Sequence, residues 1–192
     1  MLKKFLTLFM LSILSCTMMC CTTNASSVQE DIPTSIPDMS GYRNMDAQDH
    51  VYTEISFASL IELFRRKETA MVMISRENCI YCQNAVWVLN EAAKETGTAV
   101  YYVNADAPIS AEGGKEENQR LYEELCGYME DALRADETGE KGLYIPVVLN
   151  IQKGKLVKHH VSLTDSFNAS QSEVLTEEEA KELTEIYKEV LK

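Results

Sequence analysis

Residues 51–192 contain short apolar runs that alternate with segments of helical periodicity. Five segments have the continuous or alternating apolar residues that are typical of strands: residues 51–55, 70–74, 98–103, 147–151 and 155–161. The run at 70–74 is apolar throughout, which indicates a strand covered on both faces. The weaker alternation at 51–55 indicates an edge strand. A turn at Lys153-Gly154 joins the last two segments, so these should form a hairpin.

Four segments space their apolar residues three or four positions apart, as helices do: residues 56–67, 80–96, 117–136 and a last segment that begins at Thr176. Gly97 is expected to end the second helix, and Asn78 to be its N-cap. In the last helix, Glu179 follows Thr176 by three residues, which is the pattern of a capping box. The third helix should turn the following residues to the core: Leu121, Leu125, Met129 and Ala132.

The predicted order is strand, helix, strand, helix, strand, helix, strand, strand, helix. Strands that alternate with helices imply a sheet between two layers of helices. The final hairpin adds an antiparallel pair to this sheet. The expected fold class is therefore α/β, as a three-layer α/β/α sandwich with a mixed central sheet.

Residues 1–25 have the features of a secretory signal peptide. Two lysines precede an apolar stretch at residues 5–14, which is short for a helix that spans a membrane. Small residues allow cleavage after Ala25. Alternatively, the letters ILSC that end at Cys16 are similar to a bacterial lipobox, in which Cys16 would be lipidated. An uncleaved membrane anchor is the third interpretation, and each of the three predicts an extracytoplasmic location.

Residues 26–50 are rich in Ser, Thr, Asn, Asp and Pro and contain few large apolar residues. This composition predicts a flexible linker. The folded domain is then expected to span residues 51–192, which is long enough to bury a core.

The chain has 192 residues and a net charge of −12. Nucleic-acid binding depends on clustered Lys and Arg, so this charge argues against nucleic acid as a partner. Three of the six Cys residues lie in or beside the leader, and the domain keeps Cys79, Cys82 and Cys126. Three thiols are too few for a disulfide-rich scaffold, and a reactive pair with one remaining thiol describes them better.

Cys79 and Cys82 lie where a buried strand passes into a helix. The free N–H groups and the positive dipole end of a helix N-terminus favour a thiolate, which is the attacking species in disulfide exchange. The second thiol lies one turn further on, close enough to form a disulfide with the first. We therefore expect Cys79 to be the nucleophile and Cys82 the resolving thiol.

At this point the sequence resembles the thioredoxin superfamily over roughly residues 51–192. The resemblance depends on a buried strand that leads into the motif CIYC at residues 79–82, on the helix that follows, and on the letters LYIP at residues 143–146 before a hairpin. It implies that Pro146 is cis and packs against the cysteine pair. It also implies that Ile145 flanks the disulfide and that the neighbouring main chain pairs with a substrate peptide.

The sequence also departs from thioredoxin itself. Thioredoxin has a buried Asp on the strand before the motif and a partner Lys on the next strand, and these positions align with Met73 and Tyr102. Glu77 is a nearby carboxylate that would replace the Asp poorly if it is exposed. Residues 106–142 are longer than in compact thioredoxins and are expected to be a helical insertion. These features resemble exported thioredoxin-like lipoproteins and the bacteriocin-transport accessory proteins.

Other interpretations of these residues remain open. The cysteine pair could be an inert disulfide, or part of a zinc site with His159 and His160. Neighbouring residues on a strand point to opposite faces, which argues against both histidines joining one metal site, so no metal is expected. Cys126 fits core packing or a second resolving thiol. Tyr81, between the cysteines at an exposed helix start, is expected to contact substrate.

The function expected from the sequence is an extracytoplasmic thiol–disulfide oxidoreductase that needs no cofactor. Its expected partners are thiols or disulfides of exported proteins or peptides, an electron-transfer partner in the membrane, and the membrane itself if Cys16 carries a lipid. The alternative is a non-catalytic accessory or binding protein of the same fold, which assists export or assembly of a secreted peptide. The direction of electron flow is left open by the motif.

Overall fold

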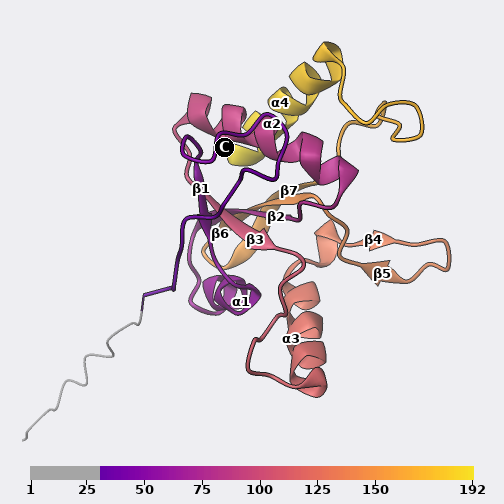
Figure 1. Ribbon diagram of the computed structural model, residues 1–192. Helices are drawn as coiled ribbons and strands as arrows, with labels where there is room; N and C mark the ends of the chain where they lie inside the picture. The colour runs from indigo at the N-terminus through magenta and orange to yellow at the C-terminus, as the bar shows by residue number, and fades with distance from the viewer. Residues whose placement is uncertain (1–30) are drawn as a thin grey trace, which may run out of the picture. The chain divides into compact units, whose positions relative to one another are not determined.

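The computed structural model describes residues 31–192 and has a five-stranded sheet at its centre (Figure 1). The strands are β1 (Tyr52–Glu54), β2 (Ala70–Ser75), β3 (Val100–Asn104), β6 (Val147–Gln152) and β7 (Lys155–Val161). The predicted signal peptide, Cys16 and the start of the predicted linker lie outside the described residues. No helix within residues 31–192 has the length and apolar character needed to cross a membrane.

The sheet is mixed, and its strand order is β1-β3-β2-β6-β7. Strands β1, β3 and β2 run parallel, whereas β6 pairs antiparallel with both β2 and β7. The predicted strands, the hairpin and the edge position of β1 are therefore confirmed.

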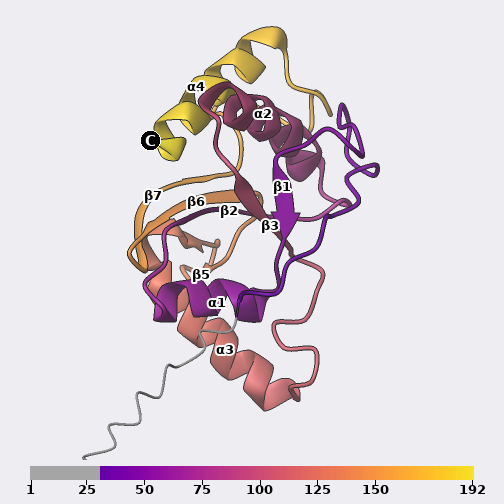
Figure 2. The ribbon, with the colours of Figure 1, turned by 90° about the vertical axis from the view of Figure 1, so that its left-hand side faces the viewer.

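Two helices cover each face of this sheet (Figures 1 and 2). The four helices are α1 (Phe57–Arg65), α2 (Ile80–Thr96), α3 (Lys115–Tyr128) and α4 (Glu177–Leu191). Helices α2 and α4 pack together over one face, and α1 and α3 lie over the other. The expected three-layer α/β/α sandwich is confirmed.

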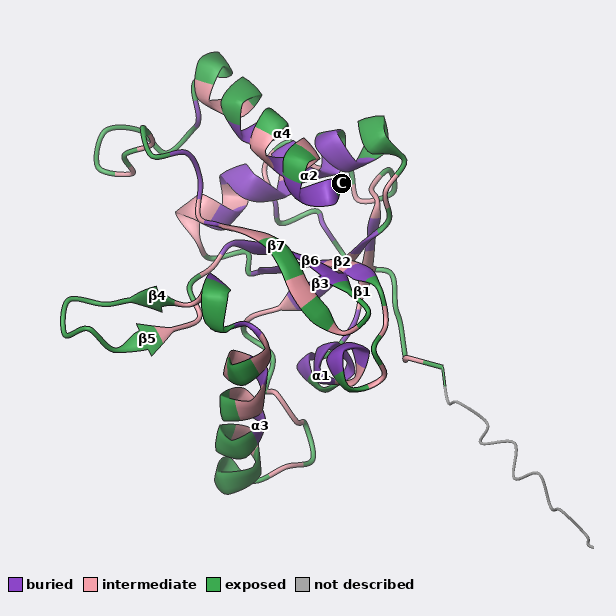
Figure 3. Ribbon diagram, turned by 180° about the vertical axis from the view of Figure 1, so that it is seen from behind, coloured by how far each residue is buried: buried purple, intermediate pink, exposed green. Residues whose placement is uncertain are grey.

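Strand β2 is apolar throughout because both of its faces are covered. Val72 and Ile74 belong to the core beneath α1 and α3, and Met73 between them belongs to the core beneath α2 and α4. All three side chains are fully buried, and purple marks the buried residues of the central strands in Figure 3. Side chains alternate between the faces of a strand, so two-sided burial removes the polar positions that a half-exposed strand would have.

Capping residues fix several helix ends where the sequence predicted them. The Ser56 side chain caps α1, and Thr176 and Glu179 form the predicted capping box of α4. Helix α2 ends at Gly97, whose φ of 67° lies in the left-handed region that glycine adopts without strain.

Helix α3 is shorter than the predicted helix at 117–136. It ends at Tyr128, one residue after Gly127, a poor helix former, and a 3₁₀ turn follows at Glu130–Ala132. A short hairpin of β4 (Arg134–Ala135) and β5 (Lys141–Gly142) completes the segment and projects from the body of the fold (Figure 3). The four predicted core residues of this segment are all buried: Leu121, Leu125, Met129 and Ala132.

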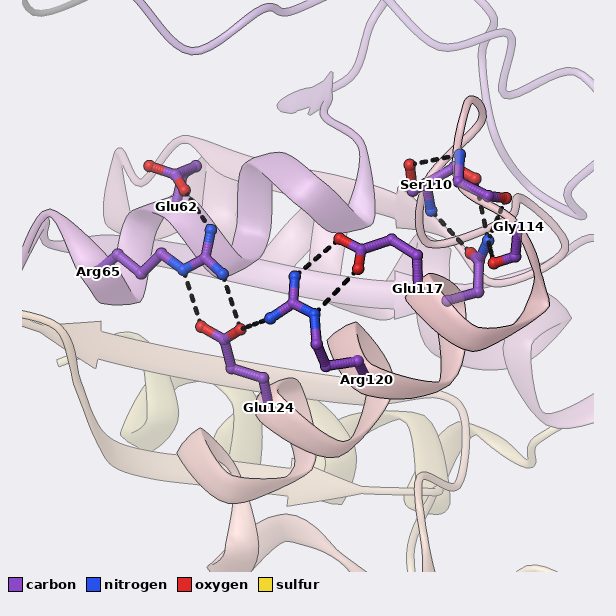
Figure 4. A network of polar contacts seen from close by, with 9 residues as sticks. Glu62, Arg65, Ser110, Gly114, Glu117, Arg120 and Glu124 are labelled. Carbon is purple, nitrogen blue, oxygen red and sulfur yellow. Dashed lines mark hydrogen bonds and ion pairs between the residues drawn. The ribbon is translucent and has the colours of Figure 1, made fainter.

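The predicted helical insertion at 106–142 contains α3. This helix is a regular part of the fold, because α3 and α1 together form the helix layer on one face of the sheet. Ion pairs join α3 to α1 on the surface (Figure 4). Arg65 donates to both carboxylate oxygens of Glu124 at 2.7 Å, and Arg120 pairs with Glu117 and Glu124. Exposed pairs contribute little each, so the buried apolar residues between the two helices provide most of the attachment.

The prediction of a flexible linker at 26–50 is wrong for residues 31–50, which are part of the folded unit. Met39 and Tyr42 are buried against α2 and α4, with exposed fractions of 0% and 4%. The main chains of Ser35 and Glu54 also exchange two hydrogen bonds, of 3.0 and 2.7 Å. The few apolar residues of this polar segment form no periodic pattern, so the sequence did not predict that Met39 and Tyr42 are buried.

Candidate active site

Cys79 is the N-cap of α2, the position that the sequence assigned to Asn78. Asn78 is exposed, whereas Cys79 has extended backbone angles and its Sγ accepts a hydrogen bond of 3.2 Å from the amide nitrogen of Cys82. The prediction for Asn78 is therefore wrong. The sulfur itself receives the N–H groups that the start of a helix leaves unpaired.

Cys82 lies one turn into α2 and is fully buried, whereas Cys79 is half-buried. Both thiols are free, so the structure shows the dithiol form. The thiol of Cys82 donates a hydrogen bond to Cys79. The two sulfurs thus differ in access to solvent and in hydrogen-bond role.

These contacts shift the pKa values of the two thiols in opposite directions. The hydrogen bond from Cys82, the amide N–H groups of Cys82 and Tyr81 and the charge of Arg76 together lower the pKa of Cys79 to about 6, although burial opposes them. The hydrogen bond to Cys79, followed by burial, raises the pKa of Cys82 well above its usual range. Cys79 is therefore the thiol that ionises near neutral pH.

The Ile145–Pro146 peptide bond is cis, as the resemblance implied. Strand β6 pairs antiparallel with β2, with Val147 opposite Ile74, so Pro146 lies beside the end of β2 that leads to Cys79. Pro146 is buried, and its carbonyl accepts from the amide nitrogen of Ser162 at 2.8 Å. The structure thus brings this turn and the cysteine pair to the same edge of the sheet.

Ile145 is half-buried and contacts the apolar cores on both sides of the sheet. Cys79 also packs on the α2/α4 core that Ile145 touches. No hydrogen bond among the described residues engages the main chain of Ile145. Its peptide groups are therefore available at the edge of the site.

Tyr81 is half-buried rather than exposed. Its ring meets the ring of Phe167 edge-on, with centroids 5.4 Å apart. Phe167 belongs to the loop at residues 162–175 between β7 and α4. This loop therefore packs beside the cysteine motif.

Asn84, which the sequence analysis did not single out, fastens that loop to α2. Its amide group donates to the carbonyls of Ile80 and Glu173 at 2.8 and 2.9 Å, and its oxygen accepts from Leu175 N at 3.1 Å. Asn84 is fully buried. The one sequence signal that could have marked Asn84 is an asparagine in the interior of a predicted helix, where asparagine is unfavourable unless its side chain has hydrogen-bond partners.

Gln83 joins the N-terminal segment at residues 31–50 to the start of α2. Its oxygen accepts from Arg43 N at 2.8 Å, and its amide group donates to the carbonyls of Gly41 and Glu77 at 2.9 and 2.8 Å. Arg43 in turn pairs with Glu173 of the loop at 162–175. The motif therefore lies between two segments distant in sequence.

The strand positions that align with the Asp and Lys of thioredoxin carry Met73 and Tyr102, as the sequence indicated. These residues lie opposite each other on β2 and β3. Glu77 is exposed. The groups that most strongly set the pKa of Cys82 are Cys79, Ser75 and the Arg76 main chain, and none is a carboxylate.

The remaining candidates lie elsewhere. Cys126 is half-buried on α3, on the opposite side of the sheet from α2, and burial raises its pKa. His159 and His160 are half-buried, and Nε2 of His160 is 3.1 Å from the carbonyl of Leu163. Within residues 31–192, no group of three His, Cys, Asp or Glu side chains is arranged to hold a metal ion.

The strand order, the two helix layers and the cysteine motif at the β2–α2 junction beside a cis-proline define a protein with a thioredoxin-like fold. The fold that the resemblance implied is therefore confirmed. The narrower resemblance to exported lipoproteins and bacteriocin-transport accessory proteins stays a prediction.

No protein-family model matches the sequence, and neither does any curated protein. A solved structure described as a proposed oxidoreductase with a thioredoxin fold is 14% identical, covering 62% of this chain and 88% of its own, with a TM-score of 0.39. Thioredoxin from Aeropyrum pernix is 17% identical, covering 57% of this chain and 74% of its own, with a TM-score of 0.34.

Proposed function

We propose that the protein is a thiol–disulfide oxidoreductase in which Cys79 is the nucleophile and Cys82 the resolving thiol. One observation carries this proposal: the half-buried sulfur of Cys79 caps α2 and accepts hydrogen bonds from the amide and the thiol of Cys82. A thiolate with a pKa near 6 is largely ionised at neutral pH. Disulfide exchange requires no cofactor.

The reductive direction illustrates the chemistry. The thiolate of Cys79 attacks one sulfur of a substrate disulfide, the substrate S–S bond breaks, and one substrate sulfur leaves as a thiolate that takes up a proton. Cys82 then loses its proton and attacks the sulfur of Cys79, which releases the second substrate sulfur. The substrate gains two electrons and two protons, and the protein ends with a Cys79–Cys82 disulfide. A dithiol reductant must then restore the enzyme.

The substrate is proposed to be a peptide segment that lies across the turn at Ile145 and Pro146. The unengaged main chain of Ile145 supports this pairing. The rings of Tyr81 and Phe167 offer an apolar surface at the other side of the motif, so Tyr81 is assigned to substrate contact together with Phe167.

The proposed location is extracytoplasmic, with exported proteins or peptides as substrates. The two lysines and the apolar stretch within residues 1–25 support export, and the lipobox-like letters before Cys16 support attachment to the membrane by a lipid. A membrane protein that supplies electrons would then be the reductant. Mass spectrometry of the exported protein tests lipidation, because a modified Cys16 becomes the new N-terminus.

The function is tested by dithiothreitol-driven reduction of insulin with the full-length protein. We expect Cys79→Ser to abolish the acceleration, because no other described thiol has a lowered pKa. Cys82→Ser should instead accumulate a mixed disulfide with the substrate, visible as an added mass on Cys79.

Cys126→Ser is the matched control, since it removes a half-buried thiol on the other side of the sheet. It should leave the rate unchanged. Insulin reduction at the wild-type rate by Cys79→Ser would contradict the proposal and favour a binding protein that assists a secreted peptide without catalysis.

A further inference from the structure

The resolving step presents a physical difficulty, because Cys82 must lose its proton while fully buried. Charge in an apolar interior is costly unless polar groups stabilise it. The face of the sheet beneath α2 offers no carboxylate on the strands next to the motif, where Met73 and Tyr102 lie opposite each other. Some other group must stabilise the sulfur as its charge forms.

Three buried hydroxyl groups form a chain that ends at this sulfur. The hydroxyl of Tyr42 lies 2.9 Å from that of Tyr102 and 3.1 Å from Oγ of Ser75. Ser75 is fully buried at the end of β2 and makes a side-chain hydrogen bond with Cys82. Tyr42 and Tyr102 are each 4% exposed, so the chain is shielded from solvent.

The two links between hydroxyl groups can reverse their direction. Either oxygen can be the donor in the Tyr42–Ser75 and Tyr42–Tyr102 hydrogen bonds. In the dithiol the thiol of Cys82 donates to Cys79, whereas the hydrogen bond with Ser75 lowers the pKa of Cys82, so the Ser75 hydroxyl is the donor to this sulfur. The hydroxyl of Tyr102 at the far end of the chain also lies 3.5 Å from the main-chain carbonyl of Ser75. When Cys82 becomes a thiolate, Ser75 continues to donate to it, and each tyrosine can turn to donate to the next oxygen of the chain.

We propose that the hydroxyls of Ser75, Tyr42 and Tyr102 form a positioning network that stabilises the sulfur of Cys82 as it becomes a thiolate in the resolving step. This inference rests on the proposed function. Tyr42 then makes the segment at residues 31–50 a component of the redox centre, because no other described residue joins Ser75 to Tyr102 through its side chain.

The step balances without a further reactant. Cys82 loses a proton and its sulfur forms a bond with the sulfur of Cys79. The bond between Cys79 and the substrate sulfur breaks, the electron pair leaves with the substrate, and the departing thiolate takes up the proton. The hydroxyl network gains and loses no proton over the step, since it only donates hydrogen bonds toward Cys82.

Charged and titratable groups from several elements face this network. They are Cys79 and Tyr187 toward Cys82, Arg76 toward Cys79, Glu54 and Glu77 toward Tyr102, and His160 against the ring of Tyr187. Glu77 is the carboxylate nearest to the motif in sequence, so it is the competing proton acceptor that an experiment must separate from the hydroxyls.

Ellman's reagent separates the two thiols in one stopped-flow experiment. Attack by Cys79 releases a first equivalent of thionitrobenzoate, and attack by Cys82 on the resulting mixed disulfide releases a second. The reaction is followed from pH 5 to 10 on the full chain, with Cys16, Cys20, Cys21 and Cys126 replaced by serine so that only the pair reacts.

We expect Tyr42→Phe and Ser75→Ala to slow the second phase about tenfold and to move its pH midpoint upward by about one unit, which is what loss of one hydrogen bond to a charged group implies. The first phase should keep its rate and its midpoint. Ser75→Ala tests the same network if Tyr42→Phe fails to fold.

Tyr52→Phe is the matched control. Tyr52 is as buried as Tyr42 and packs edge-on against Tyr102, but its hydroxyl donates to the carbonyl of Val86. Both phases should stay within about twofold of the parent, because this hydroxyl is outside the chain. Circular dichroism and thermal melting confirm that each variant is folded.

The outcomes separate the two proposals. A normal second phase in both Tyr42→Phe and Ser75→Ala overturns the hydroxyl network. A shifted second phase in Glu77→Gln with none in Tyr42→Phe also overturns it, in favour of the carboxylate. If the parent protein shows no fast first phase or releases one equivalent alone, the proposed function fails instead.

Discussion

The amide nitrogen of Cys82 lies 3.2 Å from Sγ of Cys79, so the candidate nucleophile caps the helix that carries its partner. A thiolate accepts this hydrogen bond more strongly than a neutral thiol does, and the positive end of the helix dipole adds to the preference. Ionisation of Cys79 and the capping of α2 are therefore coupled. Two predictions depend directly on this relationship.

The first concerns the reactivity of Cys79. Alkylation by iodoacetamide requires the thiolate, so the rate of Cys79 labelling should rise with a midpoint near pH 6. Cys82 should remain unlabelled over the same range because it is buried and its pKa is raised. Peptide mapping by mass spectrometry measures both sites.

Arg76→Ala provides the comparison for this measurement. The charge of Arg76 lowers the Cys79 pKa, so its loss should move the midpoint upward while the fold is kept. A wild-type midpoint above about pH 8, as for an ordinary cysteine, would show that the cap does not stabilise the thiolate.

The second prediction concerns stability and pH in the reduced protein. The folded pKa of Cys79 is about 6, below the value of about 8.5 expected in the unfolded chain. The unfolded state thus binds more protons between these values, and the free energy of unfolding rises with pH from about 6 to 8.5. Cys82 has a raised folded pKa, so above about pH 8.5 its contribution falls with increasing pH.

Guanidinium unfolding under reducing conditions at pH 6, 7 and 8 measures this slope. In Cys79→Ser, the free energy of unfolding should rise less steeply with pH, because the contribution of the Cys79 thiol is absent. Burial lowers the pKa of His159 and His160 below the unfolded value of about 6.5, so these residues also make stability rise with pH at the acid end of this range, and the difference between wild type and Cys79→Ser removes their effect. Identical slopes in the two proteins would contradict the coupling.

The third prediction concerns Asn84, which holds the loop at 162–175 beside the motif. Asn84→Ala removes three hydrogen bonds and leaves the buried N–H of Leu175 unpaired, so unfolding should become easier by about 1–3 kcal/mol. Limited proteolysis should then cut within residues 162–175. Asn90→Ala is the control: Asn90 is also buried in α2 but bonds to Val51, so this loop should stay resistant.

Patterns that depend on neighbours in sequence predicted most of the fold. Strand β2 was predicted because burial on both faces makes it apolar throughout, and the end of α2 because Gly97 adopts a left-handed conformation there. The cysteine pair was placed correctly because the strand-to-helix junction has a local pattern on both sides.

Contacts between distant residues were not predictable in this way. Tyr42 meets Ser75 and Tyr102 across 33 and 60 positions, and Asn84 meets Glu173 across 89. No local periodicity encodes such pairs, and a polar composition hid the burial of Tyr42. The capping of α2 was also missed, because side-chain preference favours Asn at an N-cap whereas the chain enters the helix one residue later.

The fourth prediction compares two buried tyrosines. The Tyr187 hydroxyl is fully buried and has no hydrogen-bond partner among the described residues, whereas the Tyr52 hydroxyl donates to Val86 O at 2.6 Å. Removing an unpaired buried hydroxyl relieves a desolvation cost, so Tyr187→Phe should stabilise the fold by about 1 kcal/mol. Tyr52→Phe should destabilise it by about 1 kcal/mol. Chemical denaturation measures both, and shifts of the same sign would contradict the assignment.

The last prediction concerns the turn between β6 and β7. Gly154 has a φ of 69°, and a Cβ there would lie 2.4 Å from the carbonyl oxygen of Phe64 and 2.7 Å from Cα of Lys67. Gly154→Ala therefore has two costs: the backbone is strained for a residue with a Cβ, and the Cβ clashes with main-chain atoms, which cannot move as a flexible side chain could. Gly139 has a φ of 85° in the β4–β5 hairpin, but a Cβ there meets no atom within 4 Å.

Gly139→Ala should thus cost only the conformational strain, about 1–2 kcal/mol. Gly154→Ala should cost about 1–3 kcal/mol more, because overpacking adds to the same strain. Thermal and chemical unfolding of the two variants measures the difference between them. Equal losses would mean that the turn at Gly154 moves away from α1 at no cost, and that the close approach between this turn and the end of α1 contributes nothing to holding the hairpin in place.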